Sequence, residues 1–213
     1  MTSPTPSNPT AALISDMFGQ SLSIMTRPSV DSFERFERRG GTQQALIYVG
    51  VASLIVGIVD FLRLGVFGLF SGFLGGILGF AVFTYLVYVI GRSQGGTGTQ
   101  DEVFYTFSLF SAPLLVVRAA ISLVAWLFGF IPILGFLVGI LAFLAGILVW
   151  VLSIYYGYVA VQSSHNFKSQ QQQSQALITL VVAAIAAWIV GLVISAILGS
   201  ILLGGALVNS VFR

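Results

Sequence analysis

From Ser111 to His165 the chain reads SAPLLVVRAAISLVAWLFGFIPILGFLVGILAFLAGILVWVLSIYYGYVAVQSSH. Between Arg118 and Lys168 it runs 49 residues without an Asp, Glu, Lys or Arg. A soluble domain cannot bury so long an apolar helix, whereas each crossing of a lipid bilayer needs about 20 apolar residues. The sequence GFIPILG at 129–135 offers a reversal between two such crossings. This stretch therefore predicts two membrane-spanning helices.

The composition of the whole chain is typical of a membrane protein. Of the 213 residues, 57% are hydrophobic and 8% are charged, against about 25% charged in soluble domains. The net charge of +2 and the lack of a basic run give no support to nucleic-acid binding. The sequence has no cysteine, which excludes disulfides, thiolate metal ligands and cysteine nucleophiles.

Five apolar segments predict an all-α, polytopic integral membrane protein with five transmembrane helices. These helices are expected at 44–62, 66–90, 103–129, 133–161 and 176–207, with a short turn at 63–65. Pro113 is expected to kink the third helix, and Pro132 marks the hinge before the fourth. Thr99 and Glu102 have the spacing of a capping box that opens the third helix. The length of the fifth segment leaves open whether it forms one crossing or two short pieces.

The N-terminal segment 1–43 is expected to lie in the cytoplasm and to hold short amphipathic helices. One apolar face with helical spacing comprises Ile14, Met17, Phe18, Leu22 and Met25. It predicts either a helix lying on the membrane or a loosely ordered tail. A second short helix is expected to start at Asp31, with Glu34 completing a capping box and pairing with Arg38.

Two further segments are expected to lie outside the membrane. The sequence SSHNFKSQQQQSQ at 163–175 predicts a flexible loop, because its glutamine run is of low complexity. Residues 208–213 form a C-terminal tail. The first 44 residues lack a secretory signal pattern, so the first apolar run is expected to be a crossing.

Small residues recur every four positions on two predicted crossings. Gly68, Gly72 and Gly76 form such a stripe on the second crossing. On the fifth crossing the stripe comprises Thr179, Ala183, Ala187, Gly191, Ser195 and Gly199. Small side chains let helices approach closely, so both stripes are interpreted as helix-packing faces. Packing within the chain is the first interpretation, and homo-oligomers are the alternative.

Arg118 is the one charge deep inside an apolar segment. An arginine near the centre of a crossing costs about 2.5–3.5 kcal/mol on insertion scales, so it should face protein or water. One interpretation is a structural pair with Asp60 or a contact with carbonyls freed by Pro113. The other is an anion, lipid-headgroup or transport site. Asp60 also lies three residues before Arg63 and can pair with it near the membrane surface.

The distribution of basic residues predicts a cytoplasmic N-terminus. With five crossings and this orientation, the cytoplasmic segments hold Arg27, Arg35, Arg38, Arg39, Arg92 and Lys168. The opposite side holds Arg63 and Arg213. Six basic residues against two satisfy the positive-inside rule.

The sequence offers little catalytic chemistry. Its single histidine, His165, lies in a polar loop without a second metal ligand or a nearby carboxylate, so neither a metal site nor a Ser-His-Asp triad is expected. The Gly-rich loop RSQGGTGTQ at 92–100 lacks the Gly-Lys-Ser/Thr ending of a phosphate loop. The protein is expected not to be an enzyme, and no catalytic residue, cofactor or metal is assigned.

Several short motifs in a fixed order resemble the Yip family of Ypt/Rab-interacting five-span membrane proteins, in its bacterial branch. They are Arg27-Pro28 followed by Phe33, SAPLL at 111–115, IPILG at 131–135, YGY at 156–158, and His165 with Ala176 after it. The resemblance covers roughly residues 25–207. It implies five membrane helices and a cytoplasmic N-terminus. Rab GTPase binding is not transferred, because the chain lacks the long N-terminal domain of the eukaryotic relatives with its acidic-Gly-Pro segment.

The expected function is that of a multi-pass protein of the cell membrane, here the bacterial cytoplasmic membrane. We expect a non-enzymatic scaffold or adaptor that binds other membrane proteins and membrane lipids and contributes to organising the bilayer. The alternative is a small transporter, channel or lipid-translocating protein that uses a polar site around Arg118.

Overall fold

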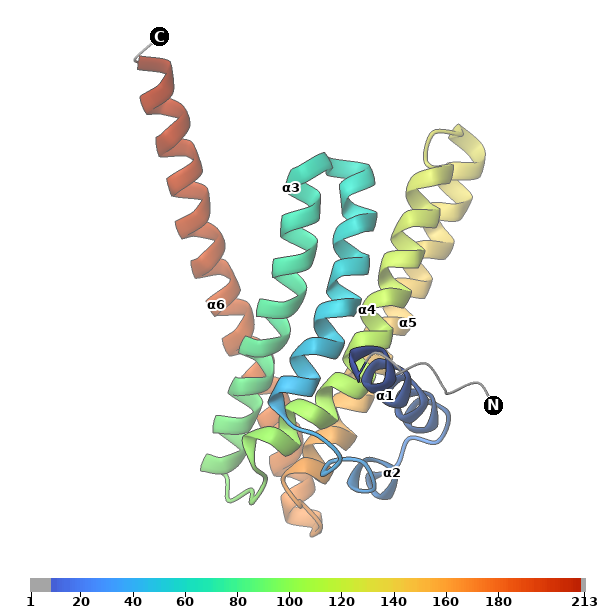
Figure 1. The fold of residues 1–213 in the computed structure, drawn as a ribbon, viewed down its shortest axis with the longest axis vertical. Coiled ribbons are helices and arrows are strands. Elements are labelled where there is room, and N and C mark those ends of the chain that lie inside the picture. Colours follow the sequence, from blue (N-terminus) through green and yellow to red (C-terminus); the bar gives the residue numbers. More distant parts are fainter. Residues whose placement is uncertain (1–8, 212–213) are drawn as a thin grey trace, which may run out of the picture.

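The structure is a computed structural model that describes residues 9–211, with side chains over residues 10–194. Helices form nearly all of this part of the chain, and it contains no strand. In order they are α1 (Pro9–Thr26), α2 (Val30–Glu34), α3 (Thr42–Ser93), α4 (Gln100–Phe128), α5 (Pro132–Ser164) and α6 (Gln170–Val211) (Figure 1). The all-helical fold class is confirmed.

Helix α3 consists of two arms that reverse direction at one glycine (Figure 1). Gly65 has φ 64° and ψ −148° between the helical arms 42–64 and 66–93. Residues with a side chain rarely adopt this conformation, whereas glycine does so at little cost. The short turn predicted at 63–65 is therefore present, and it needs no loop residues beyond Gly65 itself.

In the described part of the chain, four helices are long and apolar enough to cross a membrane. They are α3, α4, α5 and the part Gln170–Ile194 of α6. Helix α4 continues through Pro113 as one helix, and it bends in Figure 1 between its lower and upper parts. Pro132 occupies the first turn of α5, where its missing N–H would have no helical partner anyway.

Helix α6 is a single helix that begins six residues earlier than predicted, because a polar cap starts it inside the glutamine run. The Ser169 hydroxyl accepts a hydrogen bond from the Gln172 backbone N–H at 3.3 Å. The Gln172 side chain in turn accepts from the Ser169 N–H at 3.0 Å. The prediction of a flexible glutamine loop was wrong, because Ser169-x-x-Gln172 is a capping box.

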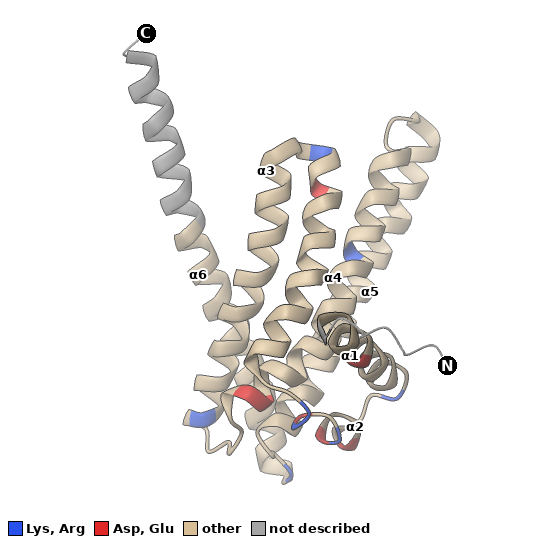
Figure 2. Ribbon diagram, in the orientation of Figure 1, with Lys and Arg blue, Asp and Glu red and all other residues tan. Residues whose placement is uncertain are grey.

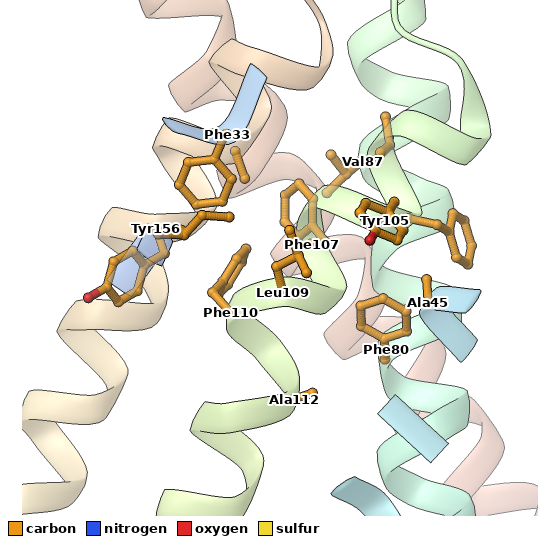
Figure 3. Close-up of a cluster of buried hydrophobic side chains, with 14 of the residues drawn as sticks. Phe33, Ala45, Phe80, Val87, Tyr105, Phe107, Leu109, Phe110, Ala112 and Tyr156 are labelled. Atoms are coloured by element: carbon orange, nitrogen blue, oxygen red, sulfur yellow. The ribbon is translucent and has the colours of Figure 1, made fainter. Parts of the chain in front are cut away.

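The buried core lies at the end of the bundle where α1 and α2 pack, here called the α1–α2 end. Residues 103–110 of α4 are all buried there. Their aromatic rings meet rings from three other helices, as in the pairs Phe33–Phe110 and Phe80–Phe104, with centroids 6.3 and 5.9 Å apart (Figure 3). Toward the other end, the far end, the helices diverge (Figure 1). Only 6% of the most apolar window of α5 is buried inside the protein.

Helix α1 is docked on the bundle rather than lying free. Met17 and Ile24 are fully buried. The Tyr105 hydroxyl donates to Gln20 Oε1 at 3.0 Å, and the Tyr156 hydroxyl donates to the Met25 carbonyl at 3.1 Å. The predicted apolar face is therefore split, because Phe18 and Leu22 remain about half exposed. Of the two interpretations of this segment, the structure favours an ordered helix.

Helix α2 begins earlier and ends sooner than its sequence pattern predicted. Ser29, not Asp31, is the N-cap, and its hydroxyl accepts from the Ser32 N–H at 3.1 Å. Glu34 pairs with Lys168 of the α5–α6 loop at 3.3 Å. The local pair predicted between Glu34 and Arg38 does not form, because Glu34 is the last residue of α2 and both side chains have distant partners.

Candidate functional site

The stripe of Gly68, Gly72 and Gly76 faces the first arm of α3. A Cβ on Gly72 would come within 2.9 Å of the Gly57 Cα, and one on Gly76 would lie against the Ser53 side chain. A Cβ on Gly68 would overlap the Asp60 carbonyl. Glycine at these positions lets the two arms approach to backbone contact. This stripe therefore packs within the chain, against the first arm of α3.

A second set of glycines faces outward. A Cβ on Gly75 or Gly79 of α3 would meet no heavy atom within 4 Å, and the same holds for Gly139 and Gly146 of α5. All four residues are exposed. The pairs lie four and seven residues apart, so each pair shares one helix face. The outer faces of α3 and α5 therefore carry glycines against which no described part of the chain packs.

Within the described side chains, the stripe on α6 is in contact only near its start. Thr179 and Ala183 are fully buried, Ala187 is half-buried, and a Cβ on Gly191 would meet nothing within 4 Å. This gradient follows the divergence of α6 from α3 in Figure 1. The predicted packing positions Ser195 and Gly199 lie outside the described side chains.

Asp60 pairs with Arg63, as their spacing predicted. Arg63 Nη1 lies 3.6 Å from Asp60 Oδ1 and donates to the Ser122 hydroxyl of α4 at 2.6 Å. The Asp60 carboxylate also lies against the glycine stripe, since a Cβ on Gly72 would be 2.9 Å from its Oδ2. This small polar cluster joins both arms of α3 to α4.

Arg118 lies one helical turn before Ser122 on α4, and it is exposed. It makes no ion pair with any side chain of residues 10–194. The structure does not pair Arg118 with Asp60, whose carboxylate pairs with Arg63 instead.

Apart from Arg118, Asp60 and Arg63, the charged residues with described side chains gather at the α1–α2 end (Figure 2). Arg38 Nε lies 3.0 Å from Glu102 Oε1. Glu102 also closes the predicted capping box, accepting from the Thr99 N–H at 2.8 Å. The Glu37 side chain is buried beside them and accepts from the Ser163 hydroxyl at 3.1 Å. Burial raises the pKa of Glu37, because a carboxylate loses hydration there.

His165 is buried at the same end, at 1% exposure, although the sequence predicted a polar loop. Its ring stacks on Phe167, with centroids 5.6 Å apart. Three glycines cradle the ring, since a Cβ on Gly91, Gly96 or Gly98 would run into His165 or the neighbouring Ser164 carbonyl. Neither ring nitrogen has a hydrogen-bond partner in the described part of the protein. The density of glycines in the 91–98 segment was the available sequence signal of this close approach.

The surroundings of His165 favour the neutral imidazole. Burial lowers the pKa of His165 to about 4 and outweighs the opposing effect of the nearby Val87 backbone, while Arg92 acts in the same direction as burial. The Thr97 N–H donates to the His165 carbonyl at 3.2 Å, and the Asn166 amide donates to the Thr97 hydroxyl at 3.1 Å. His165 therefore joins the α3–α4 loop to the end of α5. Among residues 10–194, no group of three His, Asp or Glu side chains could hold a metal ion.

The match to known families agrees with this architecture. The Yip1 domain matches residues 22–192, which include α2 to α5 and the first part of α6. A search among curated proteins and a search among solved structures each returned no match. The matched segment spans well over half of the 213 residues and contains the motifs from Arg27-Pro28 to Ala176. The chain therefore belongs to the Yip family.

Proposed function

We propose that this Yip-family protein is a non-enzymatic scaffold or adaptor of the bacterial cytoplasmic membrane, which binds other membrane proteins and helps to organise the bilayer around them. The observation that carries the proposal is the contrast between the two glycine sets. The first arm of α3 packs directly against Gly68, Gly72 and Gly76. Gly75 and Gly79 instead face outward with open space around them. In a membrane, such open small-residue faces suit another transmembrane helix.

The proposal includes five crossings and a cytoplasmic α1–α2 end. The arms of α3, 42–64 and 66–93, each exceed the roughly 20 residues that a crossing needs. Together with α4, α5 and α6 they give five crossings. The α1–α2 end then carries most of the basic residues, as the positive-inside rule requires.

Single cysteines test this orientation cleanly, because the natural chain has none. A membrane-impermeant maleimide applied to intact cells should leave Ser93→Cys unlabelled and should label Arg213→Cys. In inverted vesicles the pattern should reverse. The proposal places three crossings, by α4, α5 and α6, between these two positions. Labelling of both positions from the same side would contradict it.

The adaptor role is tested by in-membrane crosslinking of the natural chain and two matched double variants. Gly75→Leu with Gly79→Leu fills the outer face of α3, and Gly139→Leu with Gly146→Leu fills that of α5. Both variants should fold, because the added side chains meet open space. We expect each to lose a different subset of crosslinked membrane proteins, a second copy of this chain included. An unchanged set of crosslinks in both variants would overturn the proposal.

A further inference from the structure

A groove lies between α5 and α6 near the α1–α2 end, with a volume of about 650 Å³. Val151, Ile154, Tyr155 and Tyr158 line it from α5. Their spacing of three, four and seven residues is that of a single helix face. The volume falls in the range of about 300–1,000 Å³ typical of small-molecule sites.

The groove exists because the two helices touch on a neighbouring face and then diverge. Gly157 of α5 packs against Leu180 of α6, and a Cβ on Gly157 would lie 3.0 Å from Leu180 Cδ1. Ala160 and Ala176 are fully buried near this contact. Beyond it the helices separate toward the far end (Figure 1). The groove is therefore open along its side and toward the membrane interior.

The lining changes from polar to apolar along the groove. Gln170, Gln173 and Ser174 line it from the first turns of α6, and Leu177 follows further along the helix. Because α5 and α6 run in opposite directions, Tyr158 lies nearest the polar end on α5 and Val151 furthest from it. The polar end is thus at the α1–α2 end of the bundle, and the apolar end points into the membrane.

The polar end offers unused neutral hydrogen-bond donors. No partner within residues 10–194 engages the side-chain amides of Gln170 and Gln173 or the hydroxyls of Tyr158 and Ser174. No charged residue lines the groove. Tyrosine is also favoured at the level of lipid headgroups. The groove therefore combines donors at headgroup depth with an apolar wall below them.

We propose that this groove binds one glycerophospholipid from the leaflet at the α1–α2 end. The phosphate and ester oxygens are acceptors, and they match the donors of Tyr158, Gln170 and Gln173. One acyl chain lies along Val151, Ile154 and Leu177, where α5 and α6 separate. The inference needs only that these helices cross the membrane, and it does not depend on the adaptor role.

The test is native mass spectrometry of the full chain extracted in mild detergent, which counts the phospholipids retained per protein. Leu177→Trp fills the groove, and Ile178→Trp is the matched control, because Ile178 is equally exposed but lies outside the lining. We expect one retained phospholipid in the natural chain and in Ile178→Trp, and none in Leu177→Trp. Equal retention in all three proteins, or none in the natural chain, would overturn the proposal.

A second variant guards against misfolding caused by the added bulk. Tyr158→Phe with Gln173→Leu removes donors without enlarging the lining, and retention should fall several-fold. If retention is unchanged in this variant, the donors have no part in binding and the proposed site is wrong. A photo-crosslinking amino acid at Ile154 distinguishes the occupants in the native membrane. A lipid adduct supports the proposal, and an adduct only to protein contradicts it.

Discussion

Gly72 and Gly57 meet across the two arms of α3, where a Cβ on Gly72 would lie 2.9 Å from the Gly57 Cα and 3.0 Å from its nitrogen. Backbone therefore packs on backbone inside the hairpin. The one-residue turn at Gly65 fits this geometry, because a longer loop is needed only when the arms stand further apart.

Gly72→Leu should disrupt the hairpin, because the new side chain has no space between the arms. Overpacking of a tight contact costs about 1–3 kcal/mol or more. Thermal unfolding in a single detergent should show a lower midpoint than in the natural chain. Gly75→Leu is the control, since its side chain would point into open space. Equal losses in the two variants would show that the inner stripe has no special role.

The stability of the protein should fall as the pH decreases from 6.5 to 4, because of His165. The folded imidazole has a pKa of about 4, below its ordinary value of 6.5. In this range the unfolded chain takes up a proton that the folded chain does not, so protons favour unfolding. At 1.36 kcal/mol for each pKa unit the effect amounts to about 3 kcal/mol. Denaturant unfolding across this range measures it.

The matched variant for this experiment is His165→Gln, which has no titrating ring. Burial raises the pKa of Glu37, so Glu37 contributes with the opposite sign, its stabilisation decreasing as the pH rises. Glu37 is present in both proteins. The difference between the two pH profiles therefore isolates His165, and parallel profiles would contradict the prediction.

Tyr105→Phe should loosen α1 from the bundle. The substitution leaves the buried Gln20 without its hydrogen bond from the Tyr105 hydroxyl. A lost bond of this kind costs about 1 kcal/mol, which corresponds to roughly fivefold faster hydrogen exchange of the α1 amides if α1 opens locally. Tyr85→Phe serves as the control because Tyr85 is half exposed. Unchanged exchange in α1 would mean that packing alone holds the helix.

Arg63→Leu and Arg118→Leu should differ in stability. Arg63→Leu removes the partner of Asp60 and a hydrogen bond to Ser122, so we expect a loss of about 1–2 kcal/mol. Arg118→Leu removes an exposed charge that has no ion pair within residues 10–194, and the unfolding midpoint should stay the same or rise. The midpoints of thermal unfolding of both variants test this difference. A matching loss in Arg118→Leu would assign Arg118 a structural contact.

Unchanged lipid and partner crosslinks in Arg118→Leu would also remove the case for a functional site at this position. A loss of crosslinks with intact folding would restore it. The two readouts separate a structural role from a binding role, because a variant can lose its crosslinks in the membrane while its unfolding midpoint after purification stays unchanged.

The features that the sequence predicted correctly depend on neighbours along the chain. Three such features each involve residues within a few positions of one another. They are the capping box of Thr99 and Glu102, the pair of Asp60 and Arg63, and the tight turn at Gly65. Apolar runs likewise identify membrane helices without any knowledge of their partners. Such local patterns determine which segments form helices and where those helices end.

Two missed features are local caps, at Ser29 and Ser169. The others depend on contacts between distant residues. Gln20 and Tyr105 lie 85 positions apart, and no local pattern shows that α1 packs against α4. His165 looked like a lone loop histidine because its glycine cradle comes from another helix end. Arg118 and Asp60 were matched by charge alone, yet the nearer Arg63 holds the carboxylate. Charge and spacing alone do not determine which of two arginines pairs with a carboxylate.

The turns at the far end expose apolar side chains, with Phe67, Phe130 and Ile133 between 66% and 79% exposed. In a membrane such tips would sit among lipid rather than extend into water. Tips of this kind offer little polar surface to a soluble protease or antibody. Under the proposed topology, the surface open to soluble molecules lies mainly at the α1–α2 end, where most charged residues gather (Figure 2).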